Sequence, residues 1–172
     1  AGRTSRALLE HARSQVAAAL GGLPADIVFT SGGTEACNLG VRGLPGLRGG
    51  HVLTTAVEHP AVAGAIARLE RDAGVQTTRL AVPRGRPPDP DQLARALRPE
   101  TRLCAIQWVN HETGTLFPVE GYAEVCRRAG VPLFIDATQA AGKHAIDVAK
   151  LGCDLLALAS HKLGGPAGVG AL

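Results

Sequence analysis

Apolar residues recur along this chain in two spacings, and these spacings predict alternating helices and strands. The first helix is expected over residues 4–20, where apolar side chains follow helical periodicity and two glycines end the run. Short runs rich in β-branched and apolar residues then predict about six strands, at residues 26–30, 51–56, 75–82, 101–110, 131–138 and 153–160. Further helices are expected between them, at residues 33–44, 59–74, 90–99 and 119–130.

The predicted strands are mostly apolar and show little alternation with polar residues. This pattern is typical of parallel strands that helices cover on both faces. We therefore expect an α/β fold with a mostly parallel central sheet. At 172 residues the chain suits a single domain. The Pro- and Arg-rich stretch at residues 83–90 is interpreted as a surface connection within that domain.

Composition and charge argue against nucleic-acid and membrane functions. The net charge of +3 comes from scattered arginines and only 3% of residues are aromatic, so we expect no nucleic-acid surface. No apolar run approaches the ~18 residues of a membrane span. The four cysteines are widely spaced and form no metal or disulfide pattern, so we expect reduced thiols in a cytoplasmic protein. Because the sequence lacks methionine, we expect it to be a piece of a longer chain.

Polar residues collect just after five of the predicted strands. In a parallel sheet these positions share one edge, where small molecules bind. Each residue has an ordinary structural role as well, such as a helix cap or a turn former, and it is their convergence that indicates a site. The residues are Thr34, His59, Asn110, Asp136, Gln139, His161 and Lys162.

The chemistry of these residues favours pyridoxal 5'-phosphate (PLP) as a cofactor. A partly desolvated lysine at a strand end, such as Lys162, can act as a Schiff-base nucleophile. Asp136 could pair with a protonated pyridine nitrogen, and the turn at residues 31–34 offers backbone N–H groups to a phosphate. The sequence has no P-loop and no dinucleotide-binding fingerprint. Its six histidines lack metal-ligand spacing, so no metal is expected.

Five segments, in order, resemble the cysteine desulfurases of the NifS/IscS type within the class V aminotransferases. They are IVFTSGGTEACNLGVRGL, VEHPAV, WVNHETGTLFPV, FIDATQAAGKHAIDV and SHKLGGPAGVGAL. The resemblance implies the PLP-binding large domain of a fold-type-I, aspartate aminotransferase-like enzyme, which is normally a homodimer. On this reading residues 1–172 are that domain, truncated at both ends and without the small C-terminal domain.

The resemblance also assigns roles to individual residues. Lys162 would be the Schiff-base lysine, Asp136 would pair with the pyridine nitrogen, and His59 would stack on the ring and shuttle protons. These three are the expected catalytic residues. The other expected cofactor contacts are Gln139 and Asn110 near the phenolic oxygen, with Asn110 also near the substrate carboxylate, and Gly33, Thr34 and His161 at the phosphate.

Two features depart from the family pattern. Family members commonly have a serine two residues before the histidine of S-x-H-K, whereas this chain has Ala159 there and Ser160 next to the histidine. Ser160 is therefore the candidate hydroxyl for the phosphate. The family's persulfide-forming cysteine and substrate-carboxylate arginine are expected beyond residue 172. None of the four cysteines matches that cysteine, and all four are interpreted as structural thiols: Cys37, Cys104, Cys126 and Cys153.

The leading hypothesis for function is that the parent protein removes sulfur from L-cysteine. The products would be L-alanine and an enzyme persulfide for iron–sulfur cluster or thio-cofactor assembly, with a sulfur acceptor or scaffold protein as partner. Two alternatives stay open. One is another class V activity, such as selenocysteine lyase or aminotransferase, and the other is an inactive cofactor-binding domain.

Overall fold

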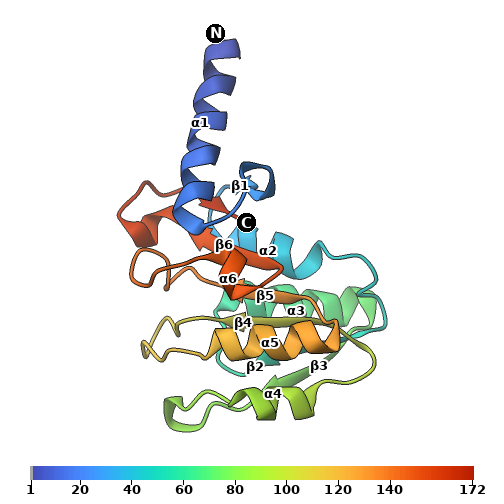
Figure 1. Ribbon diagram of the computed structural model, residues 1–172. Helices are drawn as coiled ribbons and strands as arrows, with labels where there is room; N and C mark the ends of the chain where they lie inside the picture. Colours follow the sequence, from blue (N-terminus) through green and yellow to red (C-terminus); the bar gives the residue numbers. More distant parts are fainter. Residues whose placement is uncertain (1) are drawn as a thin grey trace.

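A seven-stranded sheet lies at the centre of the computed structural model, which describes residues 2–172 (Figure 1). The strand order across the sheet is β1-β7-β6-β5-β4-β2-β3. The strands are β1 (Phe29–Thr30), β2 (His51–Thr55), β3 (Gln76–Leu80), β4 (Thr101–Gln107), β5 (Leu133–Asp136), β6 (Leu155–Ala159) and β7 (Gly170–Ala171).

Five neighbouring strands of the sheet, β3, β2, β4, β5 and β6, are parallel. This confirms the predicted α/β class. All six predicted strands are present. The seventh, β7, was not predicted because two residues, one of them glycine, leave no apolar run to detect. It pairs antiparallel with both β1 and β6. Two successive reversals make β1 run in the same direction as β6, so the turn after β1 lies at the carboxyl edge of the parallel strands.

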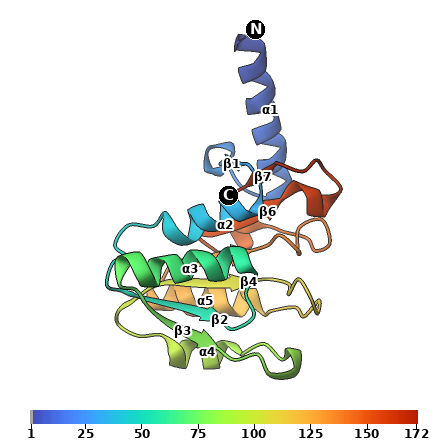
Figure 2. The same ribbon diagram turned by 180° about the vertical axis from the view of Figure 1, so that it is seen from behind.

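Helices cover both faces of the sheet, as Figure 2 shows from behind. One face is packed by α2 (Gly33–Arg42) and α3 (Pro60–Ala73), which contact each other. The other face carries α4 (Pro90–Ala96), α5 (Val119–Ala129) and the short α6 (Val148–Leu151). Each face has its own buried apolar cluster, as expected for a sheet that is apolar on both sides. Three 3₁₀ turns complete the chain: η1 (Pro24–Asp26), η2 (Pro83–Gly85) and η3 (Ser160–Leu163).

Local sequence explains where the helix beside the site begins and ends. The His59 side chain caps α3 by accepting a hydrogen bond from the Ala61 amide, and Pro60 occupies the first turn, where no intrahelical N–H is needed. Gly74 ends the helix in the left-handed conformation, at a φ of 63°. The cap therefore fixes the position of the His59 ring as well as the start of the helix.

The first helix, α1 (Gly2–Leu20), projects away from the sheet in Figure 1. Ala17 is its one buried residue. The apolar stripe that predicted this helix is exposed at Leu8 and Leu9, which are 66% and 47% exposed. Among residues 2–172, none of the helices is both long and apolar enough to cross a membrane.

Candidate active site

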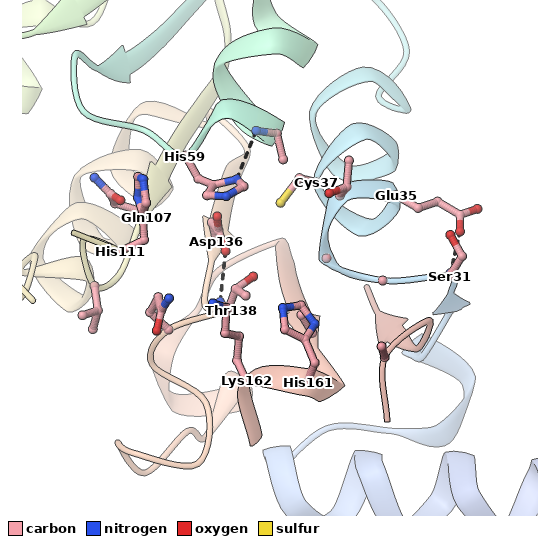
Figure 3. Close-up of a pocket in the computed structure, with 18 of the residues that line it drawn as sticks. Ser31, Glu35, Cys37, His59, Gln107, His111, Asp136, Thr138, His161 and Lys162 are labelled. Atoms are coloured by element: carbon pink, nitrogen blue, oxygen red, sulfur yellow. Dashed lines mark hydrogen bonds between the residues drawn. The ribbon is translucent and has the colours of Figure 1, made fainter. Parts of the chain in front are cut away.

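A cavity of about 560 Å³ opens at the carboxyl edge of the sheet, as the topology predicts for a parallel α/β fold. Its walls come from the turn before α2, the start of α3, the ends of β4, β5 and β6, and the loop before β7. In Figure 3, Asp136 lies between His59 on one side and Lys162 on the other, while Ser31 and Glu35 lie at one end. Segments more than a hundred residues apart in the sequence thus meet around one space.

Seven of the nine expected site residues line this cavity. They are Gly33, Thr34, His59, Asp136, Gln139, His161 and Lys162. Asn110 and Ser160 are absent from its lining.

Asn110 has a structural role in the loop after β4. It is buried, its amide donates to the Val57 carbonyl at 3.2 Å, and its Oδ1 accepts from the Thr113 amide at 2.9 Å. β4 ends at Gln107 and residues 111–113 form a turn, so Asn110 lies beyond the strand. Gln107, Val109 and His111 line the cavity, whereas the Asn110 amide donates to the same Val57 carbonyl as Gln107 and is held in the hydrogen bonds of the loop. Its predicted contact with the cofactor stays a prediction that this structure does not favour.

Ser160 begins the turn that carries the lysine. Its amide donates to the Val169 carbonyl, its carbonyl accepts from the Gly165 amide, and its hydroxyl lies against Gly165. A side chain at Gly165 would collide with that hydroxyl in its present position, so the two residues pack closely within the turn. The structure therefore places Ser160 in the support of the turn, and its predicted phosphate contact is left untested.

The amino end of α2 is built to receive an anion. Gly32, at a φ of 148°, adopts a backbone conformation that other residues rarely take, and no side chain caps the helix. Gly33 packs tightly against Ala159 at the end of β6, where a Cβ would approach to 3.0 Å. The Glu35 carboxylate accepts from the Ser31 amide at 2.6 Å, which holds the pKa of Glu35 below its usual range. The first-turn N–H groups and the helix dipole thus face the cavity as a site for phosphate.

His59 is held as a neutral imidazole above the middle of the cavity. Its Nδ1 accepts a hydrogen bond from the Ala61 amide at 3.1 Å, so the ring proton is on Nε2. Burial lowers the pKa of His59; the nearby Asp136 carboxylate works against this effect, while His111 and Lys162 add to it. His59 can therefore donate a hydrogen bond from Nε2 at neutral pH.

Asp136 ends β5 at the centre of the site. It is buried, with 6% of its surface exposed, and its Oδ1 accepts from the Thr138 amide at 3.0 Å. The Cys37 thiol is also in the lining, and burial together with the nearby charge of Asp136 raises the pKa of Cys37 well above its usual range. Cys37 is consequently a neutral thiol, as expected for a structural cysteine.

Lys162 lies on η3 with its side chain at the cavity and is exposed. The partial desolvation expected for Lys162 from the sequence stays a prediction. The other two lysines do not line the cavity: Lys143 donates to Gln139 of the lining at 2.8 Å, and Lys150 pairs with Asp147 at 2.7 Å. Lys162 is thus the lysine that can reach a ligand in the cavity.

Sequence reasoning missed the cavity residues Gln107 and His111. Gln107 is buried and donates from Nε2 to the Val57 carbonyl at 2.8 Å. The His111 ring meets the His59 ring edge to face, with centroids 4.9 Å apart and planes at 76°. Their place at the end of the strand predicted over residues 101–110 was the signal that could have found both.

Glu58 immediately precedes His59 in the chain and lies outside the cavity lining. Its carboxyl is buried, its Oε1 accepts from the Thr55 hydroxyl at 2.5 Å, and its Oε2 has no hydrogen-bond partner among residues 2–172. Burial, aided by the charge of Asp136, raises the pKa of Glu58 to about 8 against the hydrogen bonds that lower it. Glu58 is therefore largely protonated at neutral pH. The described residues contain no cluster of histidine, cysteine and carboxylate side chains that could hold a metal ion.

Comparisons with known proteins find relatives over nearly the whole chain. The chain is 38% identical to the cysteine desulfurase IscS of Dechloromonas aromatica (strain RCB), over 99% of this chain and 43% of that protein. It is 42% identical to the cysteine desulfurase IscS of Pectobacterium carotovorum subsp. carotovorum (strain PC1), over 94% of this chain and 40% of that protein. The chain thus spans about two fifths of the length of these relatives.

Solved structures show the same fold. A structure described as SspA in complex with cysteine superposes with a TM-score of 0.94 at 35% identity, over 99% of this chain and 50% of that one. A NifS-like protein superposes with a TM-score of 0.88 at 30% identity, over 99% of this chain and 48% of that one. The family model described as aminotransferase class-V matches residues 1–172. On this evidence the chain belongs to the class V aminotransferase family, among relatives that are cysteine desulfurases.

Proposed function

We propose that the full-length protein is a cysteine desulfurase, which uses PLP to convert L-cysteine to L-alanine and an enzyme-bound persulfide. The observation that supports this most strongly is the arrangement of Asp136, His59 and Lys162 around one cavity that ends at an uncapped helix. The relatives named as cysteine desulfurases and the cysteine complex of SspA support the choice of substrate.

The residues present fit PLP, the cofactor of this family. The open N–H groups at the start of α2, with Thr34 and His161 beside them, would hold the phosphate. The buried Asp136 carboxylate would pair with the pyridine nitrogen, and the lining places His59 and the Lys162 amine in the same cavity. When bound, PLP supplies the electron sink that carbon–sulfur bond cleavage requires.

The protein's own groups then have distinct tasks. Asp136 carries a fixed negative charge in a buried place, where it favours a protonated, positive partner over a neutral one. His59 offers an Nε2–H donor and holds its proton, because Nδ1 is committed to the α3 cap. Sheet and helix residues, rather than flexible loops alone, fix both side chains, and this rigidity preserves their orientation.

We also propose a cytoplasmic homodimer that passes sulfur to an acceptor or scaffold protein for iron–sulfur cluster or thio-cofactor assembly. The exposed apolar stripe of α1 at Leu8 and Leu9 is consistent with a further contact surface. Gel filtration with light scattering on the full-length protein tests the dimer.

The activity test uses the full-length protein with PLP and L-cysteine, with alanine and persulfide as readouts. We expect equal amounts of the two before an acceptor is added, and none with Lys162→Ala. Alanine release from L-selenocysteine alone would indicate a selenocysteine lyase instead. Transfer of the amino group to a keto acid would indicate an aminotransferase, and no turnover of any of these substrates would leave an inactive cofactor-binding protein.

A further inference from the structure

Two imidazole rings meet on one wall of the cavity, and their nitrogen atoms differ in their hydrogen bonds. His59 comes from the start of α3 and His111 from the loop after β4. Figure 3 shows both rings beside Asp136 and on the opposite side from Lys162. Either ring could in principle exchange a proton with a ligand, so the hydrogen bonds of each nitrogen decide which one does.

His59 has no lone pair available to a ligand. Its Nδ1 accepts from the Ala61 amide, and its Nε2 therefore carries the proton. To take up a second proton, His59 would have to release the amide that caps α3, at a cost of about 1 kcal/mol for the lost cap. Burial and the neighbouring cationic groups also oppose its charged form, although Asp136 favours it. His59 is thus suited to donate a hydrogen bond and to remain neutral.

His111 has a free lone pair in either tautomer. Its Nδ1 is buried without a hydrogen-bond partner among residues 2–172, and its Nε2 lies 3.8 Å from Glu112 Oε1, beyond hydrogen-bond length. The His111 side chain is 24% exposed, so part of the ring is open to the cavity. Because Nδ1 is buried, a ligand can reach the ring only at Nε2, which is free to accept a proton in the tautomer that carries its hydrogen on Nδ1.

The charged and titratable groups around His111 come from several elements. Glu112 follows it in the same loop, His59 meets it from α3, and Glu58 lies between β2 and α3 in the adjoining cavity. Asp136, His161 and Lys162 face the shared cavity from β5 and η3. The Glu112 carboxylate lies at the Nε2 side of the His111 ring, with Oε1 3.8 Å from Nε2.

We propose that His111 accepts the ammonium proton of the amino-acid substrate, while His59 stays neutral as an Nε2–H donor. The inference rests on the proposed function, because an amino acid enters the cavity as an ammonium ion at neutral pH and its nitrogen is a nucleophile only after it loses a proton. One proton passes from the substrate nitrogen to the free nitrogen of His111. The substrate becomes an amine, His111 becomes an imidazolium ion, and the total charge is unchanged. Lys162 is reserved for the cofactor.

The first experiment measures the two rings directly and needs no turnover. The chain is labelled with ¹⁵N-histidine, and the ring signals are assigned with His59→Gln and His111→Gln. As the pH falls, we expect the His59 signals to stay those of a neutral ring with its proton on Nε2 over the range in which His111 takes up a proton. A proton that reaches Nδ1 of His59 before His111 is charged would overturn the inference.

The second experiment measures kcat/KM for L-cysteine against pH in the full-length protein. His111→Asn should lower kcat/KM by about 10²-fold or more at neutral pH, the usual contribution of a general base. The ratio of wild-type kcat/KM to that of His111→Asn should fall about tenfold per pH unit as the pH rises, because a growing fraction of the substrate is then already an amine.

The matched control is His144→Asn, since His144 is exposed, stacks on Trp108 and lies outside this cavity. It should leave both kcat/KM and its pH dependence unchanged. A deficit of His111→Asn that is the same at every pH would show a merely structural role and refute the inference. If the wild-type protein releases no alanine at all, the proposed function is wrong, and the ¹⁵N titration still decides between the two histidines.

Discussion

The buried carboxyl of Glu58 should make the stability of this protein fall as the pH rises. Burial raises its pKa to about 8 in the folded chain, against an ordinary value of 4.5, so the folded state binds this proton more tightly than the unfolded state. The stabilisation is fully present below about pH 4.5 and is lost progressively as the pH rises to about 8. The difference between the two values corresponds to about 5 kcal/mol as an upper bound, which is comparable to the whole stability of a marginal domain.

Glu58→Gln removes the titration and keeps the shape of the protonated side chain. Urea unfolding at about pH 5 and about pH 8.5 should show the variant close to wild type at the lower pH and more stable by several kcal/mol at the higher pH. Glu120→Gln, at an exposed position of α5, is the matched control and should change neither value. Equal pH dependence in wild type and Glu58→Gln would refute the reasoning, because it would mean that Glu58 ionises in the folded chain as easily as in the unfolded one.

Three further predictions concern the cavity. Borohydride reduction of the PLP-loaded protein followed by peptide mapping should place the pyridoxyl group on Lys162; label on Lys143 or Lys150 would contradict the assignment. Asp136→Asn should still bind PLP and yet lose about 10²-fold or more in turnover, since a neutral partner no longer stabilises a protonated pyridine nitrogen; unchanged turnover would return Asp136 to a purely structural role. Cys37→Ser should release alanine at nearly the wild-type rate, because the raised pKa of Cys37 keeps its sulfur a poor nucleophile at neutral pH; loss of persulfide formation with intact PLP binding would instead make Cys37 the sulfur acceptor.

The sequence was sufficient to predict the fold because most of the parallel strands are apolar runs that alternate with helical patterns along the chain. It also indicated most of the cavity, since every parallel strand delivers its following residues to the same edge of the sheet. The sequence did not distinguish between neighbouring residues at the end of a strand. Residues 110 and 111 both follow β4; His111 lines the cavity, and Asn110 is held by hydrogen bonds to Val57 and Thr113.

The hydrogen bonds of single atoms could not be predicted from the sequence. The motif that contains His59 suggested proton transfer, but the acceptor role of its Nδ1 depends on the cap of α3 by the same residue. The exposure of Lys162 likewise depends on which segments pack over η3, and the sequence does not specify how closely they pack.

The position of β7 between β1 and β6 has a consequence for the order of assembly. Phe29 and Thr30 pair with β7 and with no other strand, so they cannot join the sheet until residues 170–171 have been synthesised and inserted. Gly32 follows directly, and its backbone packs so closely on Gly170 that no side chain fits between them. The phosphate end of the cavity is therefore a late product of folding, which depends on contacts far apart in the sequence and forms slowly for that reason. During synthesis the parallel strands can form their core well before the protein can hold a cofactor.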